Sequence, residues 1–249
     1  MTEWITGKII KVKNWTEKLF SIVLHAPIAP FIAGQFAKLR LNIHNVSIQR
    51  AYSYVNAPNN KNLEFYLVEA KSGKFSPILR ALNPDENILI TKYASGSFIL
   101  NIIPECKNLW MISTGTAIGP YLSILQHGEN LKRFDNIVLV HAVRFYKDLS
   151  YLKKIIQLKK IYNKKLSFQI IISREKIINT LYGRIPELIF NGQLENAINL
   201  KINPKDTHIM LCGNPNMIRD TYECLNKKYF MVKNYQTSPG HITSELYWK

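Results

Sequence analysis

Cysteine is scarce in this chain, and the few cysteines stand apart. The 249 residues include 3 cysteines, Cys106, Cys212 and Cys224, and none belongs to a C-x-x-C pair. This spacing argues against a disulfide framework, a structural zinc site and an iron–sulfur cluster held by four thiolates. The 6 histidines are scattered, without an H-E-x-x-H spacing. We therefore expect no metal.

Long apolar runs are also missing. No uninterrupted apolar run approaches the roughly 20 residues that a membrane helix needs. Residues 1–11 lack the basic start and apolar run of a signal peptide. We therefore expect a cytoplasmic protein that spans no membrane.

Acidic residues are few compared with basic ones. The 33 Lys and Arg against 17 Asp and Glu give a formal charge of +16. Such an excess permits a nucleic-acid binder, a membrane-surface protein or a redox enzyme that docks an acidic partner. Much of it reflects a general abundance of Lys, Asn and Ile, because the lysines are spread along the chain.

The first part of the chain has the pattern of an antiparallel β domain. Short alternating runs are separated by turn residues, and no long helical period interrupts them. Regular short strands of this kind are typical of a barrel or sandwich. We expect an antiparallel β-barrel over residues 1–103, with strands at 8–12, 19–25, 35–43, 47–55, 63–69 and 87–93.

After Pro104 the pattern changes to strands that alternate with helices. This alternation predicts an α/β domain over residues 104–249, built on a doubly wound parallel sheet that binds ligands at the carboxyl ends of its strands. The expected strands are 109–114, 136–142, 166–173 and 207–212. The expected helices are 121–126, 149–162, 185–190 and 216–227.

Within the first half, residues 50–58 read as a strand that runs into a turn. Strand side chains alternate between faces, so Arg50 and Tyr52 point the same way. An arginine fork suits a phosphate, and a phenol ring suits a flat heterocycle. A bend at the strand end could bring the Ser53 hydroxyl beside the same heterocycle. An ordinary barrel strand with a surface arginine is the alternative.

The segment 73–77 has the pattern of a helix start. Ser76 is expected as the N-cap residue, with Pro77 at the first helical position. Free N–H groups at a helix start can bind an anion. A capped surface helix is the alternative.

The R-x-Y-S pattern at Arg50 resembles the flavin-binding strand of the ferredoxin–NADP⁺ reductase family. In that family the arginine holds the FAD pyrophosphate and the tyrosine stacks on the isoalloxazine. The G-T-x-x-x-P turn after Gly115 also resembles the family, although it is not the G-x-G-x-x-G fingerprint. The resemblance implies FAD contacts at Arg50, Ala51, Tyr52, Ser53, Tyr66, Lys74, Phe75, Ser76, Thr116, Tyr247 and Trp248.

Three arginines of the second half stand at strand ends or at a helix start: Arg144, Arg174 and Arg184. Together they predict a site for a multiply charged anion, and arginine is the residue that accommodates the 2′-phosphate of NADP(H). Each arginine alone would be expected in solvent. With the C-G-N-P motif at Cys212, the resemblance implies NADP(H) contacts at Val143, Arg144, Ser173, Arg174, Arg184, Gly213, Asn214 and Asp220.

The resemblance extends over essentially the whole chain and is closest to bacterial ferredoxin/flavodoxin–NADP⁺ reductases. It implies an FAD-containing monomer that moves electrons between NADPH and a flavodoxin or ferredoxin, by hydride transfer between nicotinamide and flavin N5. Ser53, Cys212 and Glu245 are the implied catalytic residues. A stand-alone NADPH-dependent flavin or quinone reductase and a basic nucleic-acid-binding module remain the alternatives.

Overall fold

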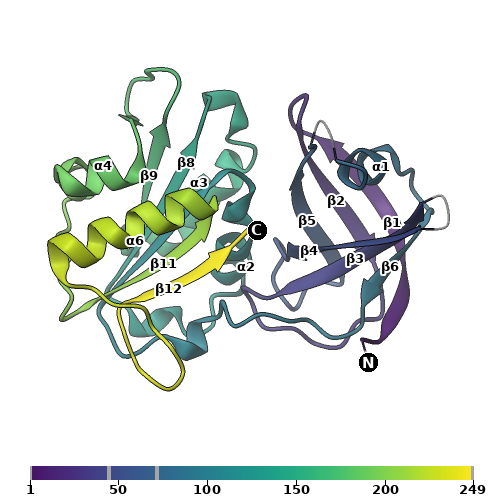
Figure 1. Ribbon diagram of the computed structural model, residues 1–249, viewed down its shortest axis with the longest axis horizontal. Coiled ribbons are helices and arrows are strands. Elements are labelled where there is room, and N and C mark those ends of the chain that lie inside the picture. The colour runs from purple at the N-terminus through teal and green to yellow at the C-terminus, as the bar shows by residue number, and fades with distance from the viewer. Residues whose placement is uncertain (1, 44–45, 71–72, 248–249) are drawn as a thin grey trace. The chain divides into compact units, whose positions relative to one another are not determined.

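The structure, a computed structural model, describes residues 2–43, 46–70 and 73–247. The chain forms two compact units (Figure 1). The first, here the barrel unit, comprises Met1–Ile99 and Gly119–Gly128. The second, here the sheet unit, comprises Leu100–Ile118 and Glu129–Lys249.

The barrel unit holds a 6-stranded antiparallel sheet in the order β4-β3-β6-β1-β2-β5. The curled sheet closes where Tyr54 bridges to Phe65 and the Val55 N–H donates to the Glu64 carbonyl at 2.8 Å. The predicted antiparallel barrel is confirmed. Its strands are β1 (Trp4–Asn14), β2 (Leu19–His25), β3 (Phe36–Ile43), β4 (Val46–Ser53), β5 (Asn62–Val68) and β6 (Asn87–Thr91).

Alternating apolar residues build the barrel core. Phe20, Ile22 and Leu24 of β2 are buried in one cluster with Phe65 and Leu67 of β5. Residues two apart on a strand share a face, so this spacing turns one face of each strand inward.

Two helices belong to the barrel unit, α1 (Ser76–Ala81) and α2 (Gly119–His127). In α2, the Ser123 hydroxyl donates to the Asn56 carbonyl at 2.7 Å, and the Gln126 amide donates to the Val55 carbonyl at 2.7 Å. These two contacts of α2 thus join it to the segment between β4 and β5 of the barrel unit, although the helix follows the first strand of the second sheet in the chain.

The sheet unit holds a 6-stranded parallel sheet in the order β10-β9-β8-β7-β11-β12. From β7 the chain first adds strands on one side and later on the other, so the topological switch point lies between β7 and β11. The predicted doubly wound sheet is confirmed. The strands are β7 (Asn108–Thr114), β8 (Asn136–Val143), β9 (Leu166–Ile172), β10 (Leu181–Tyr182), β11 (Thr207–Gly213) and β12 (Ile242–Leu246).

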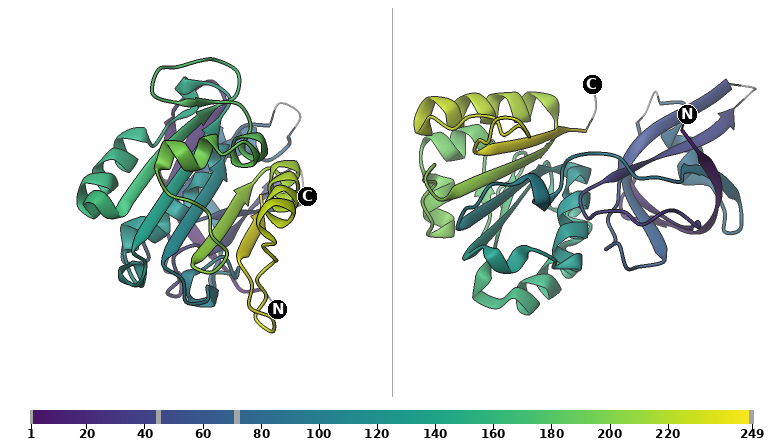
Figure 2. Two further views of the ribbon diagram at one scale, coloured as in Figure 1. Left: turned by 90° about the vertical axis from the view of Figure 1, so that its left-hand side faces the viewer. Right: turned by 90° about the horizontal axis from the view of Figure 1, so that it is seen from below.

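Helices cover both faces of this sheet (Figure 2). On one face, Ile112, Val140 and Leu211 pack with residues of three helices, α4 (Ile185–Phe190), α5 (Gln193–Ile198) and α6 (Pro215–Tyr229). On the other face, Leu152 of α3 (Leu152–Tyr162) packs with Ile172. The sequence did not predict α5, β10 or β12. Among the described residues, no helix is long and apolar enough to cross a membrane.

Candidate active site

The inward face of β4 carries two of the predicted FAD residues. Arg50 and Tyr52 stand opposite Leu39 and Ala37 of β3, which are both buried, so the two side chains share the inward face. Arg50 is exposed, and Tyr52 is half-buried. Burial raises the pKa of the Tyr52 phenol above its usual value, and the charge of Arg50 opposes that rise. The structure therefore places a cation beside an uncharged, flat ring.

Phe75 adds a second ring next to Tyr52. The two ring planes lie within 8° of parallel, with centroids 6.3 Å apart. Phe75 immediately precedes α1 and is buried, while the neighbouring Lys74 is exposed. On β4 itself, Ala51 is exposed and Ser53, the last residue of the strand, is buried. The predicted residues of β4 and of the α1 start thus meet through Tyr52 and Phe75.

The start of α1 differs from the sequence prediction. Phe75 is the N-cap residue, and no side-chain cap bond is found there within the described part of the chain. Ser76 is instead the first helical residue, and its hydroxyl accepts the Ala70 N–H at 3.0 Å. The prediction that Ser76 caps the helix with Pro77 at its first position is wrong. The hydroxyl closes the preceding loop, and the helix begins one residue earlier.

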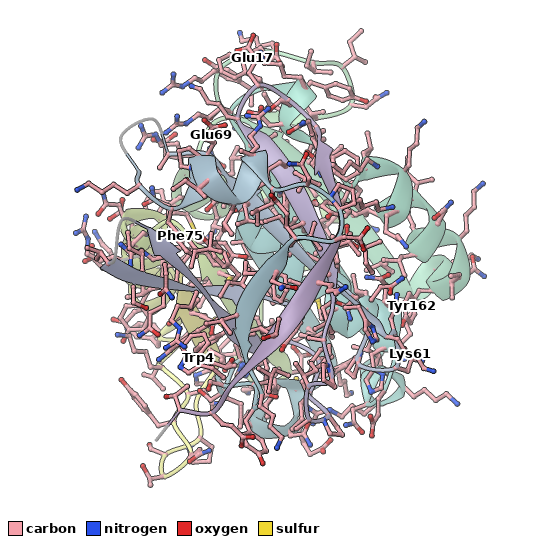
Figure 3. All side chains as sticks on the ribbon, turned by 90° about the vertical axis from the view of Figure 1, so that its right-hand side faces the viewer. Trp4, Glu17, Lys61, Glu69, Phe75 and Tyr162 are labelled. Carbon is pink, nitrogen blue, oxygen red and sulfur yellow. The ribbon has the colours of Figure 1, made fainter. Side chains whose placement is uncertain are left out.

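Arg80, which the sequence analysis missed, anchors α1 to the barrel. Its guanidinium donates to the Asn14 side chain at 2.8 Å, the Thr16 carbonyl at 3.1 Å and the Glu69 carboxylate at 2.6 Å. It also donates to the Glu17 carbonyl. Figure 3 labels Glu17 and Glu69 at the end of the barrel where α1 lies. A rigid fork with several acceptors fixes a helix better than a single ion pair would.

Tyr66, another predicted FAD contact, is only 1% exposed. It stands opposite Ser21 of β2, on the face of β5 that Phe65 and Leu67 do not share. Its contact with FAD stays a prediction.

The switch point of the sheet unit is built around Thr114, another residue that the sequence analysis missed. Gly213 has φ +143°, and a Cβ there would lie 2.1 Å from the Thr114 hydroxyl oxygen. The same oxygen accepts the Asn214 N–H at 3.0 Å. The Asn214 side chain in turn accepts from Asn216 N at 2.8 Å and Met217 N at 3.3 Å, so it caps α6. Only glycine at 213 lets the two strand ends approach so closely.

Cys212 and Glu245, both predicted to be catalytic, are register partners on β11 and β12. Burial, and less strongly the nearby Glu245 carboxylate, raise the pKa of the Cys212 thiol well above its usual value. Burial also raises the pKa of Glu245 to about 7. One Glu245 carboxylate oxygen is buried without a hydrogen-bond partner among the described residues. The pair is therefore a neutral thiol beside a carboxyl group that titrates near neutral pH.

Tyr247 lies next to the same strand ends. Its N–H donates to the Gly213 carbonyl at 3.1 Å, and its phenol donates to the Thr116 carbonyl at 3.2 Å. The segment before it, for which the sequence predicted no strand, is the parallel strand β12. Trp248 lies outside the described residues.

The predicted phosphate residues gather at the carboxyl edge of the sheet. Pairing of β8 with β9 continues beyond both strands, because Ser173 N donates to Val143 O and Arg174 N donates to Arg144 O, each at 3.1 Å. Arg144 and Arg174 therefore stand on adjacent backbones, and both are exposed. Two cations held this way favour a multiply charged anion.

A third arginine and a carboxylate complete this edge. Gly183 N donates to Ile172 O at 3.2 Å, which brings the exposed Arg184 to the end of β9. Glu175, which the sequence analysis missed, accepts the Tyr146 N–H and so ties the loop after β9 to the loop after β8. The contact joins two chain segments far apart in the sequence.

Asp220, predicted to contact NADP(H), is half-buried on α6. Its carboxylate accepts from the neighbouring Arg219 at 3.1 and 3.2 Å. Its contact with a nucleotide stays a prediction.

A curled antiparallel barrel and a doubly wound parallel sheet with a cationic edge define a two-unit protein with a candidate site for an anionic ligand. Residues 111–223 match the family model described as the oxidoreductase NAD-binding domain. The chain is 53% identical over 248 residues to a flavodoxin/ferredoxin–NADP reductase of Escherichia coli K12, covering 100% of both chains. It is 52% identical over 257 residues to one of Buchnera aphidicola subsp. Schizaphis graminum, again over 100% of both chains.

A solved structure agrees with these relatives. The ferredoxin NADP⁺ reductase of Neisseria gonorrhoeae, solved with bound FAD and NADP, superposes with a TM-score of 0.94 at 32% identity, covering 100% of both chains. The chain belongs to the flavodoxin/ferredoxin–NADP reductase family and is an oxidoreductase. The resemblance inferred from the sequence is confirmed.

Proposed function

We propose that this chain is an FAD-containing reductase that moves electrons between NADPH and a one-electron carrier protein, flavodoxin or ferredoxin. The observation that carries the proposal is the cluster of Arg144, Arg174 and Arg184 at the carboxyl edge of the parallel sheet. It occurs in a chain that matches reductases of that name over their whole length.

The barrel unit offers groups that suit FAD. Arg50 provides an exposed guanidinium for the pyrophosphate, and Tyr52 beside it provides a flat, uncharged ring for the isoalloxazine. Lys74, Phe75 and Ser76 at the α1 start complete the proposed site, together with Ala51 and Tyr66. The anchoring of α1 by Arg80 supports this assignment, because it fixes the segment from which Lys74 and Phe75 extend.

The sheet unit offers groups that suit NADP(H). Three exposed arginines complement the negative charge of the ribose 2′-phosphate of NADP(H). A site for NAD(H), which has a 2′-hydroxyl there, would instead place an acidic residue. Val143 and Ser173 provide the paired backbone from which two of the arginines extend. Gly213, which has no Cβ, lets the ends of β7 and β11 meet at the switch point, where doubly wound sheets bind their ligands. Asn214 and Asp220 are assigned to the same nucleotide.

Bound FAD would supply the chemistry, accepting a hydride from nicotinamide C4 at N5 and passing on single electrons. The chain's own residues would hold the two rings in reactive contact and exclude water from them. Cys212 is assigned to the nicotinamide region as a buried, uncharged thiol, and Glu245 as a carboxyl group that titrates near pH 7. Ser53 is assigned as a hydroxyl near N5. Thr116, Tyr247 and Trp248 are assigned to the flavin as well.

The net charge of +16 supports an acidic carrier protein as partner, because opposite charges raise the rate of encounter. We also propose that the protein is a cytoplasmic monomer, and that its functional domains are residues 1–103 and 104–249.

An absorption spectrum followed by a reduction experiment tests the function. The purified protein should be yellow, with the bands of oxidised flavin, and NADPH added without oxygen should bleach them. The reduced protein should then reduce flavodoxin or ferredoxin faster than it reduces free FMN. A protein without flavin that takes up none from added FAD would overturn the proposal. Faster turnover with free flavin or quinone would instead identify a reductase without a carrier.

A further inference from the structure

His141 lies near the carboxyl end of β8 and is 1% exposed. Its Nε2 is 2.9 Å from the Gly115 carbonyl oxygen, at the turn that follows β7. A carbonyl oxygen can only accept a hydrogen bond, so Nε2 must carry the proton. Burial lowers the pKa of His141 to about 4, so the ring is neutral at pH 7. The other ring nitrogen, Nδ1, is buried without a hydrogen-bond partner in the described part of the chain.

The carbonyl that His141 holds belongs to an unusual turn. Gly115 has φ +56°, in the left-handed region that glycine enters without strain. Because a peptide group is planar and trans, holding the Gly115 carbonyl toward β8 turns the Thr116 N–H the opposite way. The next carbonyl, that of Thr116, accepts the Tyr247 phenol at 3.2 Å. Side chains from β8 and from beyond β12 thus hold two successive carbonyls of one turn.

Buried contacts with the neighbouring strand β7 fix the backbone that carries His141. In the parallel ladder His141 is the register partner of Ser113, and the Ser113 hydroxyl donates to the Val140 carbonyl at 3.1 Å. Both residues are buried inside the sheet unit. A side chain fixed by packing on a central strand can hold a neighbouring turn more accurately than one on a loop.

We propose that His141 is a positioning residue for hydride transfer: its Nε2–H fixes the Gly115–Thr116 peptide and, through the Thr116 carbonyl, the place of Tyr247. The inference rests on the proposed function, because Thr116 and Tyr247 are assigned there to the flavin. His141 itself touches neither nucleotide in this assignment. It acts through the turn, and its loss should slow the chemical step without weakening nucleotide binding.

Three substitutions of His141 distinguish the effect of losing the hydrogen bond from the effect of losing the volume of the ring. In His141→Gln the amide nitrogen reaches about as far as Nε2, whereas in His141→Asn it stops near the position of Nδ1. His141→Leu removes the donor altogether. The FAD-loaded proteins should be mixed with NADPH in an anaerobic stopped-flow instrument. We expect His141→Gln to reduce its flavin within about 3-fold of the wild-type rate, and the other two to be about 10- to 100-fold slower.

In His141→Asn and His141→Leu we expect slower reduction of the flavin by NADPH. Their Kd for NADPH and their FAD content should stay within about 2-fold of wild type. A wild-type rate in His141→Leu would overturn the inference, and so would a His141→Gln as slow as His141→Leu. ¹⁵N NMR of histidine in the wild-type holoprotein tests the bond even if the variants fail to fold. It should show the neutral Nε2–H tautomer at pH 7, and the Nδ1–H tautomer would overturn the inference. A wild-type flavin that NADPH does not reduce would overturn the proposed function, and with it this role.

Discussion

At the scale of single residues, the three arginines at the sheet edge differ from the other cations of this basic chain in what surrounds them. Arg174 and Arg144 are joined by a backbone hydrogen bond at 3.1 Å, and Glu175 fastens their two loops together. The two backbone segments that carry these arginines are therefore held together before any ligand arrives, which lowers the entropy lost when a phosphate binds.

Replacing Arg174 with alanine should impair the use of NADPH far more than the use of NADH. A charge-assisted hydrogen bond is worth about 1.5–3 kcal/mol, so KM for NADPH should rise roughly 10- to 100-fold. KM for NADH, which has no 2′-phosphate, should stay within about 2-fold. Steady-state assays with a fixed carrier measure both. Lys205→Ala is the matched control, because it removes an exposed cation from the turn before β11, at the other edge of the sheet. Equal losses with the two nucleotides would contradict the assignment.

The sequence predicted these arginines because strand–helix alternation alone locates the carboxyl edge of a parallel sheet. It could not predict Thr114, Glu175 or His141. Each of these acts by a hydrogen bond to a segment distant in the chain, and such a bond leaves no local pattern. Ser76 is a similar case. The sequence predicted that it caps α1, but its hydroxyl accepts a hydrogen bond from the Ala70 N–H instead.

At the scale of elements, strong local periodicity decided what could be predicted. The strand β2 has the predicted limits, 19–25, and α4 the predicted limits, 185–190. The strand β12 was missed because Ile242–Leu246 is short and becomes a strand only by pairing with β11. The helix α1 has only six residues, Ser76–Ala81, so its stability depends on tertiary contacts more than on its own hydrogen bonds.

We therefore predict that Arg80→Lys weakens FAD binding without unfolding the barrel. Lysine can keep an ion pair with Glu69 but cannot reach Asn14 and Thr16 at the same time, so the segment before α1 would lose its fixed position. The Kd of the apoprotein for FAD, measured by flavin fluorescence, should rise about 5- to 20-fold, which corresponds to one or two lost hydrogen bonds.

The control for this prediction is Lys92→Gln, which breaks an exposed ion pair with Glu3 elsewhere in the barrel unit. Its FAD affinity should equal that of the wild type. Circular dichroism should show the same secondary structure in both variants. An Arg80→Lys protein that binds FAD as tightly as Lys92→Gln would refute the role of Arg80.

At the scale of the whole molecule, buried histidines should make the protein sensitive to acid. Burial lowers the pKa of His141 to about 4 and that of His208 to about 3, from 6.5. Between these values and 6.5 the unfolded chain binds more protons than the folded one, so the free energy of unfolding falls as the pH drops below 6.5. By pH 4, His141 alone should account for a loss on the order of 3 kcal/mol.

Glu245 should act in the opposite direction, and its effect can be isolated by one substitution. Its pKa is about 7 in the folded protein and 4.5 when unperturbed, so the folded state binds more protons between these values. The contribution of Glu245 to the free energy of unfolding is therefore fully present below pH 4.5 and is lost as the pH rises through 7. Urea unfolding should show Glu245→Gln more stable than the wild type by about 1–3 kcal/mol at pH 8, and nearly equal to it at pH 4.5.

Glu105→Gln is the control for this comparison, because it makes the same change from carboxyl to amide in a side chain that is 90% exposed. A Glu245→Gln variant with the same stability as the wild type at both pH values would show that burial of the Glu245 carboxylate does not destabilise the fold. A carboxylate that destabilises the fold at working pH is retained where it serves the reaction. Glu245→Gln should therefore also reduce flavin more slowly than the wild type, and a gain in stability together with a loss of rate would support its place at the nicotinamide.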